Sequence, residues 1–247
     1  KTRLAEPAVL IDLGKISTLS YINEQDGGLA IGAMTTYSEI AGSELVQSNA
    51  PVLAEASGQV ADNQIRNRGT IGGSLSHSDP AGDLPAVALA LGAQLTTSSS
   101  GAHRTISADD FFVDLLTTAL EPNEILSEIV IPALPAGTGT AYAKFANKAS
   151  HYAVVGVAAV VTVGSDGTCQ SARIGITGAG PKATRATGTE SALVGSNLDD
   201  SAVRAAASHA GDGIDFNEDV HASGEYRAHL ISVYAARAIR AAVENAS

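Results

Sequence analysis

The segment at residues 66–85, RNRGTIGGSLSHSDPAGDLP, constrains the fold of this chain more than any other stretch. Glycines lack Cβ, so Gly69, Gly72 and Gly73 permit positive φ and allow a ligand to approach backbone N–H groups closely. Several consecutive N–H groups turned inward make an anion-binding nest, which suits a pyrophosphate. The hydroxyls at residues 70 and 74 can donate to phosphate oxygens from its rim. A TIGGS stretch on its own favours a plain structural turn, because Gly-rich turns are common.

The continuation SDPAGDLPAVALALG favours a nucleotide site over a plain turn. Asp79 and Asp83 stand four residues apart, Pro80 imposes a turn, and Pro85 opens a predicted helix that Gly92 closes. Asp83 is the predicted N-cap of this helix, and it is also a candidate acceptor for a ribose hydroxyl or a flavin N–H. The sequence has neither G-x-G-x-x-G after a βα unit nor G-x-x-x-x-G-K-[ST]. A bound nucleotide would therefore need a fold other than a Rossmann or P-loop fold.

Charge and composition remove several classes of function. The 247 residues carry a net charge of -11, and no Lys/Arg cluster could neutralise a nucleic acid backbone, so we expect no nucleic acid partner. The longest apolar run, 153–163, has 11 residues against the roughly 20 needed to cross a bilayer, so we expect no membrane span. Cys169 is the single cysteine and the six histidines lack metal-ligand spacing, so we expect no metal site. We find no catalytic triad and expect no catalytic residue in this chain.

The hydrophobic pattern predicts strands and short helices first, then strands followed by helices, which is typical of an α+β protein. A Pro- and Gly-rich stretch at 133–141 is the candidate domain boundary. Two short helices are expected within 35–60, with Thr36 or Ser38 as an N-cap and Pro51 at a first helical position. The other predicted strands are 9–13, 19–22, 29–34, 93–100, 103–107, 124–132, 141–146, 152–163 and 170–178, and the other predicted helices are 84–92, 108–117, 189–195, 201–210 and 225–245.

At this point the sequence resembles a known family. The stretch QIRNRGTIGGSLSHSDPAGDLPAVALALGA, with AMTTYSEI before it and EILSEIVIP, AYAKFANKASHYAVVGVAAVV and GEYRAHL after it, is similar to the FAD-binding medium subunit of the molybdenum hydroxylases. Carbon monoxide dehydrogenase, xanthine dehydrogenase and nicotine dehydrogenases belong to that family. The resemblance implies a vanillyl-alcohol-oxidase-type (PCMH) FAD-binding domain at 1–135, followed by a smaller α+β flavoprotein domain at 140–247 with a three-stranded sheet plus helices. The family's second glycine-rich loop, AGG(H/Q)S, would lie upstream of Lys1, so the N-terminal part of the FAD-binding domain is expected to be absent from this sequence.

The resemblance also assigns the site residues. Asp83 matches a carboxylate at the adenosine ribose end of FAD, Leu126 an apolar contact to the ring system, and Lys144 a cation near the flavin pyrimidine edge. Such a cation would stabilise the anionic reduced flavin. Tyr152 covers one face of the isoalloxazine or, alternatively, is a strand-edge aromatic. The residues that would hold the pyrophosphate through backbone N–H groups are Thr70, Ile71, Gly72, Gly73 and Ser74, with Ser74 standing where Asn is more usual.

Other polar residues near the site are interpreted without a ligand role. His77 is interpreted as a polar turn residue, and Arg66 and Arg68 as donors of structural hydrogen bonds that fix the loop.

The function implied is an oxidoreductase subunit that carries FAD and transfers electrons. A partner large subunit would hold molybdopterin, and a small subunit would relay electrons through [2Fe-2S] clusters to this FAD, in a dimer of heterotrimers. An external acceptor, which is NAD, a quinone or a cytochrome, would take them. The expected location is the cytoplasm or the inner face of the membrane. The alternatives are a stand-alone flavin reductase of the same fold and a non-catalytic assembly module that has lost flavin.

Overall fold

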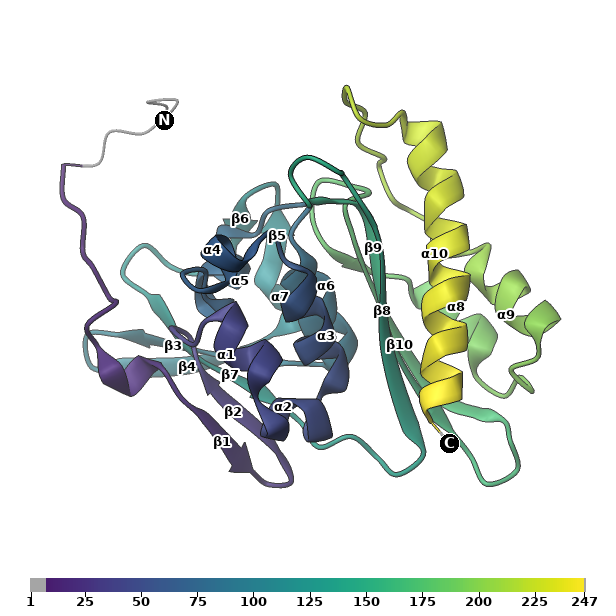
Figure 1. Ribbon diagram of the computed structural model, residues 1–247, viewed down its shortest axis with the longest axis horizontal. Coiled ribbons are helices and arrows are strands. Elements are labelled where there is room, and N and C mark those ends of the chain that lie inside the picture. The colour runs from purple at the N-terminus through teal and green to yellow at the C-terminus, as the bar shows by residue number, and fades with distance from the viewer. Residues whose placement is uncertain (1–7, 247) are drawn as a thin grey trace.

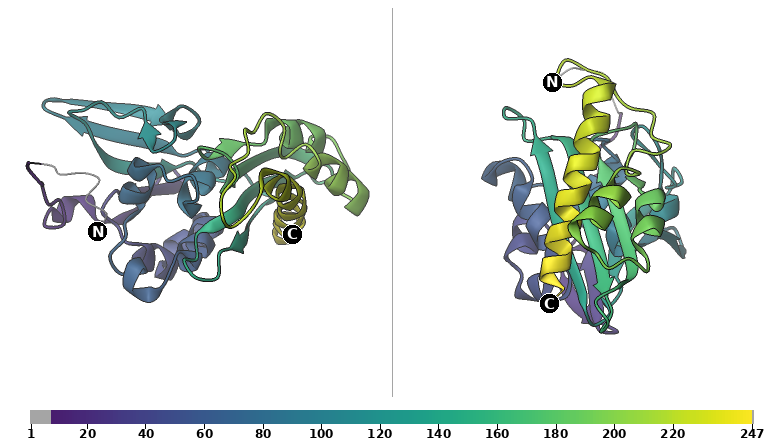
Figure 2. Two further views of the ribbon diagram at one scale, coloured as in Figure 1. Left: turned by 90° about the horizontal axis from the view of Figure 1, so that it is seen from above. Right: turned by 90° about the vertical axis from the view of Figure 1, so that its right-hand side faces the viewer.

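The computed structural model describes residues 8–246 and arranges them in four layers, a sheet, a set of helices, a second sheet and a second set of helices (Figure 1). Helices α1, α3 and α6 lie between the two sheets, and α10 lies on the outer face of the second sheet (Figures 1 and 2). The mixture of helices and sheets agrees with the predicted α+β class.

The first sheet has five antiparallel strands in the order β1-β2-β7-β3-β4. Asp26 and Gly27, both at positive φ, form the β1–β2 turn. The predicted strand at 9–13 is wrong: these residues have no regular structure, and no described strand pairs with them to bury their apolar side chains. The strands are β1 (Ile22–Gln25), β2 (Gly28–Gly32), β7 (Ile125–Ile131), β3 (Gln94–Ser99) and β4 (Ala102–Ser107), preceded by the 3-10 turn η1 (Ser17–Leu19).

The helices of the first half are short, and several of their boundaries lie at residues that favour helix ends. Thr36, one of the two predicted candidates, is the N-cap of α1 and forms a capping box with Glu39. Pro51 opens α3 and Gly92 closes α6 at positive φ, both as predicted. Residues 35–60 hold three helices instead of two, because Ser43 ends α1 and its hydroxyl caps α2. The helices are α1 (Tyr37–Gly42), α2 (Glu44–Asn49), α3 (Pro51–Gln59), α4 (Asn63–Arg66), α5 (Ile71–His77), α6 (Asp83–Leu91) and α7 (Ala108–Phe111).

Two predictions about this half need correction. Asp83 is the first residue of α6 and Gly82 is its N-cap, so the expected aspartate cap is wrong. The helix predicted at 108–117 ends at Phe111, and the chain continues as the hairpin β5 (Phe112–Asp114) and β6 (Thr117–Thr118). Phe112 instead pairs with Thr118 across the hairpin, and the side chains of Phe111 and Phe112 are both buried.

The second sheet has four antiparallel strands in the order β11-β10-β9-β8, one more than predicted. The extra strand, β11, has only two residues, too few for a sequence pattern. The β9–β10 hairpin turns at Gly167, which has positive φ. The strands are β8 (Thr138–Ala146), β9 (Ala153–Val163), β10 (Cys169–Thr177) and β11 (Thr184–Arg185), and the helices that follow are α8 (Thr187–Leu193), α9 (Asp200–Ala207) and α10 (Gly224–Asn245).

The second sheet is buried on both faces and belongs to two hydrophobic cores. Along β9, Ala158 and Val160 pack into the core of the first half, and the alternate residues Val157 and Ala159 pack into the core under α10. Every residue of β9 except the last is buried. That the units 1–135 and 140–247 are separate domains therefore stays a prediction.

Glycines set the distance between this sheet and its helices. A Cβ at Gly175 of β10 would lie 2.0 Å from the Ala86 carbonyl oxygen of α6, and one at Gly139 of β8 would lie 1.9 Å from the Ala242 carbonyl oxygen of α10. The helices thus contact the strand backbones directly on both faces.

Candidate functional site

The main candidate site is a cavity of about 540 Å³ beside α5, referred to below as the α5 cavity. It brings together segments far apart in sequence: the start of α5, the end of α4, the start of α6 and the β8–β9 loop. Five of the nine predicted site residues line it: Thr70, Gly73, Ser74, Asp83 and Tyr152.

The floor of the cavity is the first turn of α5. Thr70 is the N-cap, and its hydroxyl accepts a hydrogen bond from the Gly73 N–H at 3.1 Å. The N–H groups of Ile71 and Gly72 donate to the carbonyls of Thr35 and Ala33 at 3.0 and 2.8 Å. The predicted nest is therefore wrong for Ile71 and Gly72, because their N–H groups hold α5 against the preceding chain.

The glycines of GTIGG (69–73) act through their small size and not through positive φ. Gly69, Gly72 and Gly73 are absent from the positive-φ residues among the described part of the chain. A Cβ at Gly72 would lie 2.5 Å from the Cβ of Ala33, so this glycine permits tight packing behind the cavity. A Cβ at Gly73 would meet only the Thr70 hydroxyl, at 2.9 Å, so its backbone faces the cavity side.

Asp83 belongs to a buried polar group that joins α6 to β8. One carboxylate oxygen accepts from the Tyr142 hydroxyl at 2.5 Å, and the other accepts from the Lys144 ammonium at 2.8 Å. The side chains of Asp83 and Lys144 are 5% and 3% exposed. Burial raises the pKa of Asp83, and Lys144 and then Tyr142 oppose that shift by stabilising the carboxylate.

Four predicted residues do not line the α5 cavity. Ile71 and Leu126 are buried in the core of the first half, Gly72 packs on Ala33, and Lys144 pairs with Asp83. The ammonium of Lys144 also donates to the Gln59 carbonyl at 3.3 Å. Its position is thus behind Asp83, and a direct contact between Lys144 and a flavin stays a prediction.

Several cavity residues were not predicted as ligands, although two of them had been considered. Arg68 and His77 line the cavity, whereas Arg66 donates to the carbonyls of Val60 and Ala61, the structural role expected of it. The signal for Arg68 was its place two residues before TIGGS, which alone does not separate it from Arg66. The remaining unpredicted lining residues include Tyr37, Ile65, Asp79 and Ser150.

Tyr152 stands at the open side of the α5 cavity and is half exposed. It follows a tight turn in which Asn147 accepts from the N–H groups of Ala149 and Ser150, and in which His151 adopts positive φ. Burial and then the charges of Asp79 and Asp83 raise the pKa of Tyr152, so its hydroxyl is protonated at neutral pH. The side chain is placed to lie against a ligand, which agrees with the predicted ring-covering role, although that role remains a prediction.

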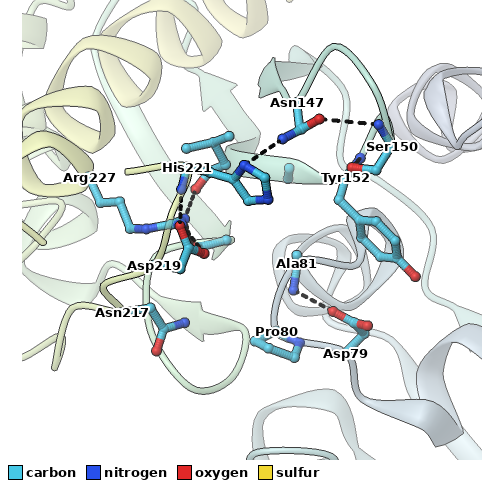
Figure 3. Close-up of a pocket in the computed structure, with 13 residues that line it drawn as sticks. Asp79, Pro80, Ala81, Asn147, Ser150, Tyr152, Asn217, Asp219, His221 and Arg227 are labelled. Carbon is cyan, nitrogen blue, oxygen red and sulfur yellow. Dashed lines mark hydrogen bonds and ion pairs between the residues drawn. The ribbon is translucent and has the colours of Figure 1, made fainter. Parts of the chain in front are cut away.

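A second cavity, of about 430 Å³, lies on the other side of Tyr152 (Figure 3). Asp79, Ser150 and Tyr152 line both cavities. The far wall comes from the segment before α10 and from α10 itself, through Asn217, Asp219, His221 and Arg227.

Within residues 8–246, no group of three or more His, Cys, Asp or Glu side chains is placed to hold a metal ion. Among the helices of the same residues, none combines the length and apolar character that a membrane crossing requires.

Comparison with known proteins gives matches along the whole chain. Residues 1–134 match the family profile described as the FAD binding domain in molybdopterin dehydrogenase, and residues 140–242 match the CO dehydrogenase flavoprotein C-terminal domain. The chain is 37% identical over 244 residues to the 6-hydroxypseudooxynicotine dehydrogenase complex subunit alpha of Paenarthrobacter nicotinovorans, covering 99% of this chain and 82% of the relative. It is 39% identical to the carbon monoxide dehydrogenase medium chain of Hydrogenophaga pseudoflava, covering 98% and 84%.

Solved structures agree with the sequence matches. A chain of the carbon monoxide dehydrogenase of Hydrogenophaga pseudoflava superimposes with a TM-score of 0.95 at 39% identity, covering 99% of this chain and 85% of that one. A chain of quinoline 2-oxidoreductase from Pseudomonas putida 86 superimposes with a TM-score of 0.92 at 34% identity, with the same coverage.

Proposed function

This chain belongs to the FAD-binding medium subunits of the molybdenum hydroxylases, and we propose that it holds FAD in the α5 cavity and transfers electrons through it. The family consists of subunits of oxidoreductase complexes. The observation that supports the site is that Thr70, Gly73, Ser74, Asp83 and Tyr152 meet around one cavity, although they are spread over more than eighty residues.

The residues present fit a dinucleotide with a flavin ring. At the α5 end, the Gly73 N–H and the hydroxyls of Thr70 and Ser74 are the donors for a pyrophosphate, and Arg68 supplies a positive charge against it. Within the described residues 8–246, only the Thr70 hydroxyl competes for the Gly73 N–H, and a hydroxyl can rotate toward a phosphate. At the other end, Tyr152 offers an aromatic face to the ring.

When bound, FAD would supply redox chemistry in one- or two-electron steps, which would suit it to collect electrons from one-electron carriers and to pass them on to an external acceptor. The protein's own residues bind and orient it, and none of them needs to perform acid–base chemistry. The buried Asp83–Lys144 pair fixes the start of α6 against β8, so it sets the position of the cavity wall.

The proposed route of electrons begins on partner subunits. A large subunit with molybdopterin oxidises the substrate, and a small subunit with [2Fe-2S] clusters passes electrons to this FAD, in a dimer of heterotrimers. The names of the relatives, medium chain and complex subunit, support a multi-subunit assembly. The cytoplasmic location, or one at the inner membrane face, remains a prediction.

The proposal is tested by measuring FAD in the complete protein purified with its partners. We expect flavin absorbance from the wild-type complex and release of FAD on denaturation. The substitution Gly73→Val places a branched side chain on the cavity floor and keeps the pyrophosphate away from the N–H at this position. The charge-assisted hydrogen bond between them is lost, so FAD affinity falls by about tenfold or more. Gly58→Ala in α3, where a Cβ has no atom within 4 Å, is the matched control and keeps its FAD. A wild-type complex without FAD, or a Gly73→Val complex with full FAD, would contradict the proposal.

A further inference from the structure

The second cavity shares the wall formed by Tyr152, Asp79 and Ser150 with the α5 cavity (Figure 3). We propose that the second cavity binds the external electron acceptor, and that this acceptor is a quinone. The inference rests on the proposed function, because a site next to the flavin cavity acts as an acceptor site only if FAD occupies that cavity.

The first support is a hydrogen-bond donor fixed in the cavity wall. The Oδ1 of Asn147 accepts from two backbone N–H groups, of Ala149 and Ser150, so its Nδ2 faces His221 and donates to the imidazole Nδ1 at 3.1 Å. Because Nδ1 is the acceptor, the neutral ring carries its proton on Nε2. No hydrogen-bond partner of Nε2 is present within residues 8–246, and this N–H is a donor for a carbonyl oxygen of a ligand.

The second support is an acceptor on the same wall. The Nδ2 of Asn217 donates to the Gly180 carbonyl at 2.6 Å, and no donor to its Oδ1 is found among residues 8–246, so Oδ1 can accept a hydrogen bond. A quinone presents carbonyl oxygens, which accept hydrogen bonds, and a hydroquinone presents hydroxyls, which donate them. His221 thus suits the oxidised ligand and Asn217 suits the reduced one.

The third support comes from the apolar parts of the lining. Pro80, Ala81 and Val154 contribute aliphatic surface, and Tyr152 contributes an aromatic ring. Figure 3 shows His221 and Tyr152 on opposite sides of the space, with Pro80 and Ala81 along its lower edge. A planar, uncharged ring fits between such groups.

Charge argues against a dinucleotide acceptor. Among residues 8–246, Arg227 is the only Arg or Lys that lines the second cavity. Its guanidinium donates to the carbonyls of Val154 and Gly178, each at 2.6 Å, and to Asp219 at 2.7 Å. Its charge is therefore already neutralised. Asp79 adds a further carboxylate to the wall, so a diphosphate would meet more negative than positive charge.

The reaction balances with the flavin as the only reductant. The quinone would take up two electrons and two protons and become a hydroquinone, and the two-electron-reduced flavin, FADH2, would supply these electrons and protons and return to FAD. His221 contributes a hydrogen bond to the quinone oxygen while negative charge develops there. It does not need to change its own protonation.

The test uses the complete complex, reduced anaerobically with dithionite so that its natural substrate is not required. Stopped-flow mixing with 2-methyl-1,4-naphthoquinone follows reoxidation of the flavin as the quinone concentration is varied, and equilibrium dialysis measures quinone binding to the oxidised complex. The variant His221→Phe keeps a planar ring but removes the Nε2–H donor. His103→Phe is the matched control, since His103 is exposed on β4, bonds to Ser98 through Nδ1 and lies outside both cavities.

We expect reoxidation to saturate with quinone, and we expect the half-saturating concentration and the dialysis Kd to rise about two- to tenfold in His221→Phe, with no change in His103→Phe. Unchanged values in His221→Phe, or an equal rise in the control, would overturn the inference. Saturable reoxidation by NAD+ that His221→Phe weakens would overturn it in favour of a dinucleotide. A wild-type complex without FAD would instead refute the proposed function, and the dialysis measurement would still report on the cavity.

Discussion

Replacing Lys144 by Met is the sharpest test of how the two halves of the chain are joined. Lys144 on β8 lies 2.8 Å from the carboxylate of Asp83 on α6, and both side chains are almost fully buried. Methionine has a similar length and no charge. The variant therefore leaves Asp83 buried, and within residues 8–246 its one remaining side-chain partner is the Tyr142 hydroxyl at 2.5 Å.

The expected cost follows from the burial of the carboxylate. Removing one partner of a buried ion pair costs about 3–5 kcal/mol, because the other charge stays without compensation. Asp83→Asn combined with Lys144→Met removes both charges and keeps an acceptor for Tyr142. The double variant should recover most of the loss, since replacing a whole buried pair is often neutral or stabilising.

The assay is urea unfolding of the wild type, both single variants and the double variant, followed by far-UV circular dichroism. In Lys144→Met the pKa of Asp83 rises further, because burial already raises it and the opposing cation is gone. The folded state then keeps a proton that the unfolded state releases above pH ~4, so stability falls as the pH rises. The deficit should be largest at pH 7 and shrink toward pH 4.

Two results would refute this reasoning. A Lys144→Met chain within about 1 kcal/mol of the wild type would mean that water or a rearranged partner solvates Asp83. A double variant whose loss equals the sum of the single losses would mean that the two side chains do not interact energetically.

Two further predictions concern packing and acid stability. Gly175→Ala should destabilise the chain by about 1–3 kcal/mol, because the new Cβ would lie 2.0 Å from the Ala86 carbonyl oxygen. Gly58→Ala, at an exposed position of a helix, should stabilise the chain by up to about 1 kcal/mol. Urea unfolding midpoints equal to that of the wild type would contradict both predictions. Hydrogen bonds from Arg104 hold the pKa of Glu124 at about 2, below the usual 4.5, so Glu124 contributes stability above pH 4.5 that is lost as the pH falls toward 2. In Glu124→Gln, the thermal unfolding midpoint should depend less on pH between 4.5 and 2 than in the wild type. An unchanged pH dependence of the midpoint would exclude this contribution of Glu124.

The sequence predicts the elements whose ends carry their own signals. Thr36, Pro51 and Gly92 mark helix boundaries through caps and a fixed φ, and the structure places helix ends at all three. The errors fall where local signals are absent. The apolar run at 9–13 reads as a strand, but a strand forms only with a neighbour, and a neighbour is not a local property.

The site could be predicted in part, for a related reason. TIGGS identifies the segment, but its glycines look like residues chosen for positive φ, and the structure uses Gly72 for close packing against Ala33 instead. Asp83 and Lys144 were each predicted as separate ligand contacts, because their pairing joins residues 61 positions apart. Burial and partners of this kind depend on the whole fold.

The sheet that is buried on both faces has a consequence for how this protein can change over time. Adjacent residues of β9 pack against different neighbours: Ala158 packs in the core of the first half, and Val157 packs in the core under α10. The two regions that match separate sequence families thus share strand β9. Neither region could be replaced by the corresponding region of another protein unless alternate residues of β9 were also substituted. We expect the pair to be inherited together and to be difficult to recombine, even though a short connection separates them in sequence.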